Sequence, residues 1–157
     1  MIRYDRGKAV SYAHRWAFRR NASYYDFSNI GGDCTNFCSQ CLYAGCGMMN
    51  YTPDVGWFYG SPDSRAAAWS GVEFLYKFLT TNRGDGPFAS DLPLRRAQIG
   101  DIIQLSFDGA AFVHSLLVVH TRPEILVSTH TMDSDNRALS SYTYEKSRLL
   151  HILGARG

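Results

Sequence analysis

The chain has 157 residues, which is enough for one domain with a proper core and too few for two ordinary domains. Hydrophobic residues make up 45% and aromatic residues 14%, a composition that excludes extended disorder and indicates a compact globular protein. The net charge of +2 comes from basic residues spread along the chain, so the sequence predicts no nucleic-acid-binding surface. We expect one domain over residues 1–157.

No apolar run reaches the ~20 residues that a membrane span needs, and the first residues lack the apolar core of a signal peptide. The sequence therefore predicts no membrane span. It predicts a cytoplasmic protein as the chain stands, or one of the cell envelope or secreted if the chain is an excised domain. We expect a monomer.

The first half of the chain has the periodicity of helices. Residues 5–20 place small and aromatic residues on one face at helical spacing, and a turn-rich stretch follows that ends in Gly31 and Gly32. A second helix is predicted from Cys34, with Gly45 and Gly47 ending it. Residues 48–64 read as an aromatic loop, and a third helix is predicted within residues 64–82.

After Pro87 the pattern changes to short β-rich runs at residues 101–107, 112–120 and 124–130, with one more near residues 148–153. The short turns between them predict neighbouring antiparallel strands. Helices that precede strands in this way indicate an α+β fold, with N-terminal helices packed on one face of an antiparallel sheet.

All four cysteines lie in residues 34–46, in the stretch "GGDCTNFCSQCLYAGC". Their C-x3-C-x2-C-x4-C spacing differs from the paired hairpins of structural zinc sites, and a helical backbone keeps the four sulfurs from converging, so we predict no metal site. A disulfide is sterically possible between Cys41 and Cys46, but no secretory context favours it. We interpret Cys38, Cys41 and Cys46 as core residues.

Cys34 differs from the other three by its position. It follows a Gly-Gly loop and opens a helix, where the helix dipole lowers a thiol pKa and the glycines leave space for a substrate backbone. Asp33 or Thr35 can cap the free N–H groups of the helix. The sequence therefore predicts that Cys34 is a nucleophile.

A nucleophilic cysteine needs an imidazole base and a group that orients the ring. His114 lies in mid-strand on the same face as Leu116 and Val118, and we expect the helix of Cys34 to pack on that face. His130 ends the next strand and can lie beside His114 to orient it. Alternative orienting residues are Asp133, Asp135 and Asn136. The other three histidines are interpreted as surface or structural residues: His14, His120 and His151.

The segments "GGDCTNFCSQCLYAGC", "RRAQIGDIIQLSF", "HSLLVV" and "VSTHTMDSDNRALSSY" resemble a bacterial amidase-domain family. That family belongs to the papain-like cysteine hydrolases and is related to the NlpC-type and CHAP cell-wall hydrolases. The similarity runs over nearly the whole chain, and "DCTNF" followed by "SQ" is its most specific part.

The resemblance implies a papain-like (NlpC/CHAP-like) core in which the nucleophile opens a helix packed on an antiparallel sheet. It implies Cys34 as nucleophile, His114 as base and then acid, and His130 as the third polar residue, with Asp133 to Asn136 as the alternative. Relatives also use a tyrosine upstream of the nucleophile in the oxyanion hole, a position that Tyr25 matches; Tyr24 is the alternative.

These observations predict a cysteine amidase or peptidase that cleaves amide bonds through a thioester and needs no cofactor. The expected partner is a peptide or a peptidoglycan-derived amide. Tyr51, Trp57 and Trp69 are candidates for a substrate-binding wall, although ordinary packing explains each of them as well. Three alternatives remain open: an acyltransferase or deamidase with the same residues, an inactive cell-wall-binding module, and a small metal-binding structural protein.

Overall fold

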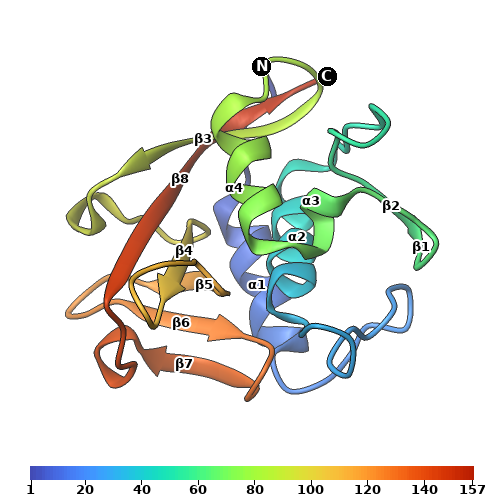
Figure 1. Ribbon diagram of the computed structural model, residues 1–157. Coiled ribbons are helices and arrows are strands. Elements are labelled where there is room, and N and C mark those ends of the chain that lie inside the picture. Colours follow the sequence, from blue (N-terminus) through green and yellow to red (C-terminus); the bar gives the residue numbers. More distant parts are fainter.

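A computed structural model describes residues 1–157, and Figure 1 shows its helices gathered on one side of its main sheet. Asp5 caps the first helix by accepting a hydrogen bond of 3.0 Å from the backbone N–H of Lys8. Gly47, in the left-handed conformation at φ 65°, ends the second helix as predicted. Each helix is too short or too polar to span a bilayer. The helices are α1 (Arg6–Trp16), α2 (Cys34–Cys46), α3 (Ala67–Ser70) and α4 (Val72–Thr81).

The third predicted helix is two helices. Gly71 has extended backbone angles (φ −112°, ψ 129°), so it separates the short α3 from α4. The prediction of one continuous helix in residues 64–82 is therefore wrong at this glycine, where a side chain would also crowd Phe74.

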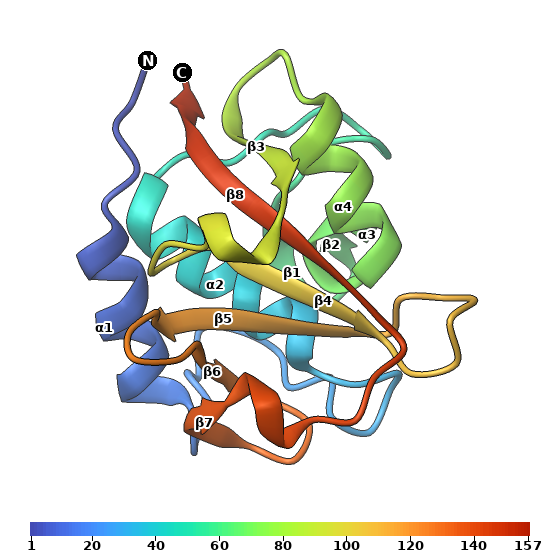
Figure 2. The same cartoon turned by 90° about the vertical axis from the view of Figure 1, so that its left-hand side faces the viewer.

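Six strands form the main sheet, in the order β3-β8-β4-β5-β6-β7, and each neighbouring pair is antiparallel. Figure 2 looks onto this sheet, with the long β8 crossing in front of the helices. A separate two-stranded sheet holds β1 and β2. The strands are β1 (Tyr59–Ser61), β2 (Ser64–Arg65), β3 (Gly86–Leu92), β4 (Ile102–Ser106), β5 (His114–His120), β6 (Leu126–Thr129), β7 (Ser134–Ala138) and β8 (Lys146–Arg156).

The sheet has an apolar cluster on each face. The larger cluster joins the helices to inward side chains such as Ile102, Leu117 and Leu150. The smaller cluster includes Leu116 and Val118, and no α-helix contributes to it. The α+β class and the antiparallel arrangement of the predicted strands are therefore confirmed.

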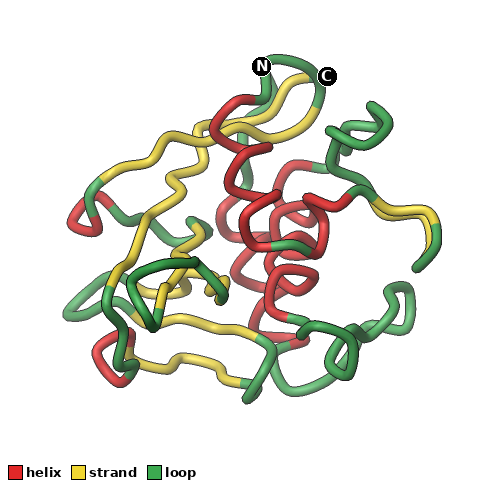
Figure 3. Tube along the Cα trace, in the orientation of Figure 1, coloured by secondary structure: helices red, strands yellow, loops and turns green.

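Much of the rest of the chain is irregular. Figure 3 shows the long loop that joins α1 to α2, which covers residues 17–33 and leads directly to Cys34. Arg20 and Asp33 hold it against the segment that joins β6 to β7, through contacts with Asp133 and His130, and the backbone N–H of Phe27 donates to Asp33 within the loop. The candidate site lies at the end of this loop.

Candidate active site

Cys34 is the first residue of α2 and is only 7% exposed. The backbone N–H groups of Cys34, Thr35 and Asn36 have no acceptor in the protein, as expected for the first turn of a helix. The Thr35 hydroxyl lies 2.9 Å from the Ser115 hydroxyl on β5. This contact joins the residue after Cys34 to the residue after His114, so α2 and β5 bring the two predicted catalytic segments together.

Burial raises the pKa of the Cys34 thiol. Hydrogen bonding from the backbone of Ser115 and from Thr35 acts in the opposite direction but does not overcome burial. Burial therefore opposes the effect expected of the helix dipole, and the raised pKa favours the protonated thiol at neutral pH. Attack on a substrate then requires a base.

His114 opens β5 and is 7% exposed. Burial lowers the pKa of its imidazole to about 4, and the charge of Arg137 acts in the same direction. No protein group forms a hydrogen bond with the ring, and the rings of Phe107 and Tyr142 lie near it at centroid distances of 6.3 and 6.0 Å. At neutral pH His114 is therefore uncharged and able to accept a proton.

The face of β5 that receives the helices differs from the predicted one. Leu117 and Val119 belong to the cluster that includes α2, whereas Leu116 and Val118 belong to the cluster on the opposite face. His114 alternates with the second set. Its position at the start of the strand, next to Ser115, is what places it in the region of Cys34.

The structure corrects the role predicted for His130. Its Nδ1 lies 2.5 Å from a carboxylate oxygen of Asp33, and its Nε2 donates to the backbone carbonyl of Trp16 at 2.8 Å. Both partners are acceptors, so an imidazolium satisfies both contacts. Because neither nitrogen is free for His114, His130 anchors the start of α2 to β6 and to the end of α1 instead.

Asp33 is fully buried and also accepts hydrogen bonds from the backbone N–H of Phe27 and the side chain of Asn36, at 2.8 and 2.9 Å. It makes no side-chain cap to the helix backbone, which corrects the predicted capping role. Its carboxylate is instead the centre of a buried polar network directly before Cys34.

The alternative orienting residues are also engaged elsewhere. Asp133 accepts two hydrogen bonds from Arg20, at 2.8 and 3.0 Å. Asp135 binds His14 and the Ser128 hydroxyl. Asn136 is exposed and adopts a positive φ of 53°. None of these side chains forms a hydrogen bond with His114.

The turn between β6 and β7 carries two successive left-handed residues, Thr131 (φ 71°) and Met132 (φ 54°). Such angles are unfavourable for residues other than glycine and are found where surrounding contacts impose them. The Thr131 hydroxyl reaches the backbone N–H of Asp33 at 3.4 Å. The strained turn therefore lies against the same loop that presents Cys34.

The aromatic candidates have different positions. Trp57 and Trp69 are fully buried and belong to the core, so the prediction that they line a substrate wall is wrong. Tyr51 is 69% exposed and stacks loosely on Phe58, whose ring centroid is 5.6 Å away. The ring of Tyr25 is 42% exposed and packs on Phe27, and its hydroxyl has no hydrogen bond in the protein.

The three other cysteines are free thiols in the apolar core. Cys38 and Cys41 are fully buried, which confirms their interpretation as core residues. No group of three or more histidine, cysteine, aspartate or glutamate side chains is arranged to hold a metal ion.

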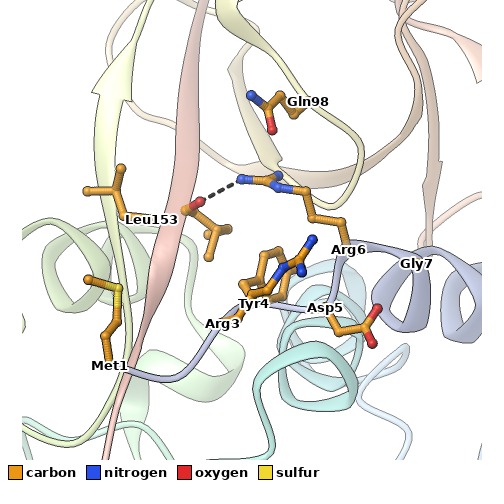
Figure 4. A pocket seen from close by; sticks show the side chains of 9 residues that line it. Met1, Arg3, Tyr4, Asp5, Arg6, Gly7, Gln98 and Leu153 are labelled. Carbon is orange, nitrogen blue, oxygen red and sulfur yellow. Dashed lines mark hydrogen bonds between the residues drawn. The ribbon is translucent and has the colours of Figure 1, made fainter.

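A cavity of about 800 Å³ lies at the other end of α1, where Tyr4, Arg6 and Gln98 line it (Figure 4). Arg6 is already bound there, to the backbone carbonyl of Ile152 and to the carboxylate of Asp101. Because the Asp33–His130 contact adjoins Trp16, at the C-terminal end of the same helix, this cavity is separate from Cys34.

Sequence reasoning missed three residues around His114: Phe107, Arg137 and Tyr142. The Arg137 guanidinium stacks 3.7 Å above the Tyr142 ring, which in turn faces His114. No sequence periodicity predicts these positions. Phe107 directly follows β4, Tyr142 directly follows a 3-10 helix (Leu139–Ser141), and Arg137 lies on the polar edge strand β7. Tyr142 is the last residue of the segment "VSTHTMDSDNRALSSY", so the family resemblance of that segment was the one feature that could have pointed to it.

The fold and the site thus define an α+β protein with a buried thiol and an uncharged imidazole where α2 meets β5. The sequence profile of the family described as "Putative amidase domain" matches residues 3–153, so the chain belongs to this family. The family description points to amide hydrolysis in general.

Over 153 residues the chain is 32% identical to "Uncharacterized protein YhbB" of Bacillus subtilis (strain 168). The match covers 93% of this chain and 46% of that protein, so the chain spans about half the length of this curated relative. No solved structure matches the chain.

Proposed function

We propose that this protein is a cysteine hydrolase with a papain-like core that cleaves an amide bond, with Cys34 as nucleophile and His114 as general base. The observation that carries the proposal is the junction of α2 and β5, where the Thr35–Ser115 hydrogen bond joins the two catalytic segments. Membership of the amidase-domain family supports the reaction class.

The directions of the two pKa shifts favour a neutral pair over a preformed ion pair. In the first step the sulfur bonds to the amide carbonyl carbon while its proton passes to a ring nitrogen of His114, and the carbonyl π electrons move to oxygen. The free N–H groups of Cys34 and Thr35 are available to that oxygen. Each such donor is typically worth ~3 kcal/mol in the transition state.

The tetrahedral intermediate then expels the amine, which takes the proton from His114, and leaves a thioester on Cys34. Water attacks the thioester carbonyl while His114 accepts its proton. Breaking the C–S bond releases the carboxylic acid and, with return of that proton, restores the thiol.

The surface next to the catalytic pair suits a peptide. Exposed apolar side chains come from the segments that flank Cys34 and His114: Ile30 is 62% exposed, Phe107 47% and Val113 53%. Together with the resemblance to NlpC-type and CHAP hydrolases, this rim supports a peptidoglycan stem peptide or its amide link as the substrate. In this proposal the three exposed side chains form the substrate-binding surface, and the buried Trp57 and Trp69 do not.

Digestion of purified cell walls by wild type and by Cys34→Ser, with mass spectrometry of the released fragments, tests the proposal. We expect fragments with a new amine and a new carboxylate from wild type only. Identical fragments from both proteins would discard Cys34 as nucleophile, and no fragments from either would discard the wall substrate. Release from wild type only would also exclude an inactive wall-binding module.

A further inference from the structure

The hydroxyl of Tyr142 is a polar atom without a partner. Its oxygen is excluded from solvent and forms no hydrogen bond in the protein, a condition shared with only one other side-chain atom, Nε of Arg20. Arg20 Nε still lies 3.2 Å from a carboxylate oxygen of Asp26, so its charge is compensated. The side chains of Ser134 and Arg137 approach the Tyr142 hydroxyl, but neither meets the geometry of a hydrogen bond with it.

A buried hydroxyl without a hydrogen-bond partner destabilises the folded protein. Natural structures keep such groups where water, a ligand or a reaction intermediate supplies the missing partner. A phenylalanine would fill the same space without that cost, so the hydroxyl needs an explanation.

The location of Tyr142 connects it to the catalytic pair. Its ring faces that of His114 at 6.0 Å, and the Arg137 guanidinium lies 3.7 Å above it on β7. Arg137 is itself fixed by a hydrogen bond of 2.8 Å from its Nε to Ser141. The ring is therefore held between the catalytic histidine and an ordered cation.

The ionisation of Tyr142 fits a donor. Burial raises the pKa of its hydroxyl and negative charge on Cys34 raises it further, while Arg137 acts in the opposite direction. The group is therefore protonated at neutral pH.

Other hydroxyls near Cys34 have partners. Thr35 binds Ser115, Ser134 donates to the backbone carbonyl of Met132, and Thr131 accepts from the backbone of Asp33. Tyr142 is thus the hydroxyl that remains available to a group arriving at the sulfur.

Building on the proposed function, we propose that the Tyr142 hydroxyl donates a hydrogen bond to the oxyanion that forms when Cys34 attacks a carbonyl, beside the N–H groups at the start of α2. Tyr142 is then a catalytic residue, because it touches the reacting oxygen. In this role Tyr142, which follows His114 in the sequence, donates the oxyanion hydrogen bond that was expected from Tyr25, which precedes Cys34.

The test compares two reactions of the same sulfur. Acylation of Cys34 by p-nitrophenyl acetate forms an oxyanion, whereas alkylation by iodoacetamide is a direct displacement and forms none. Both rates are measured in single-turnover experiments, with mass spectrometry to locate the modification. The variants are Tyr142→Phe and the matched control Tyr144→Phe, which packs against the same apolar cluster.

We expect Tyr142→Phe to slow acylation about 100-fold, the effect typical of removing one oxyanion donor. Alkylation is expected to change less than about 2-fold and the melting temperature not to fall, since the lost hydroxyl has no partner in the folded protein. Tyr144→Phe is expected to match wild type in all three measurements.

Three results overturn the inference. Undiminished acylation in Tyr142→Phe refutes the oxyanion contact and leaves the proposed function intact. An equal loss in acylation and alkylation assigns Tyr142 to the positioning of the thiol instead. A wild-type protein that p-nitrophenyl acetate does not acylate at Cys34 overturns the proposed function and this inference with it.

Discussion

Replacing Asp33 by asparagine removes the negative charge from a buried network without changing its volume. The amide still accepts from Phe27 and Asn36, but the contact at 2.5 Å with His130 loses its charge partner. His130 is 1% exposed, so water cannot replace the carboxylate as the partner of its ring. Breaking one side of a buried ion pair costs ~3–5 kcal/mol, and the two retained hydrogen bonds place Asp33→Asn near the lower value.

Urea denaturation followed by circular dichroism measures this loss, which corresponds to a fall in melting temperature of about 10 °C for a chain of this size. The matched control is Asp133→Asn, since Asp133 and Arg20 are each more than a quarter exposed (28% and 27%) and such a pair contributes ~1 kcal/mol or less. Equal losses in Asp33→Asn and Asp133→Asn would refute the reasoning that the Asp33–His130 pair anchors α2. A double variant with His130→Gln should lose less than the sum of the single variants.

Four further predictions concern the site and the helix packing. Because burial and Arg137 lower the pKa of His114 to about 4, acylation by an ester substrate should stay constant as the pH falls from 7 to 5 and decline only near pH 4; a decline centred near pH 6.5 would contradict a buried neutral base. Arg137→Gln removes the positive charge that helps to lower the pKa of His114, so the decline in rate should move to higher pH in the same measurements. A decline at the same or a lower pH would argue against an effect of Arg137 on His114. Met132→Gly relieves a left-handed backbone (φ 54°) at a side chain that is 82% exposed and should raise the free energy of unfolding by ~1 kcal/mol in urea titrations, while a loss would show that the Met132 side chain has a packing role. Gly45→Ala would place a methyl group 2.8 Å from the backbone carbonyl of Asp5 and should destabilise the α1–α2 contact by ~1–3 kcal/mol in the same assay; an unchanged midpoint would mean that the two helices can separate at little cost.

Local signals were sufficient for the elements whose boundaries depend on neighbouring residues. The Gly31–Gly32 pair, the polar Asp33 and the glycine at position 47 mark the ends of α2 correctly. The β-rich runs around Ile102, Leu117 and Val127 appear as β4, β5 and β6 in antiparallel pairing. The core role of Cys38 and Cys41 also follows from helical spacing alone.

The elements that the sequence did not predict depend on partners far along the chain. β7 has the sequence "SDNRA", which lacks apolar alternation because it lies at the edge of the sheet and pairs only with β6. β3 contains Pro87 and is the other edge strand. Both become strands through pairing, which a local pattern does not encode.

The partner of His130 was unpredictable for a similar reason. The sequence places His130 at a strand end, but whether its ring turns toward His114 or toward Asp33 depends on where the end of α1 lies. The backbone carbonyl of Trp16, 114 residues away in the sequence, accepts a hydrogen bond from Nε2 of His130 and so fixes the orientation of its ring. The burial of Trp57 and Trp69 could likewise not be predicted from the sequence, because aromatic residues are common both in protein cores and on binding surfaces.

β8 has a consequence for how the protein is made. This strand lies between β3 and β4, which pair with it and not with each other, yet its residues 146–156 are translated after both. A nascent chain that already carries Cys34 and His114 therefore emerges from the ribosome with two open strand edges, which favour association with other chains. We expect the sheet to close only when β8 inserts, so that Cys34 and His114 gain a rigid support after both have been translated and in one cooperative event.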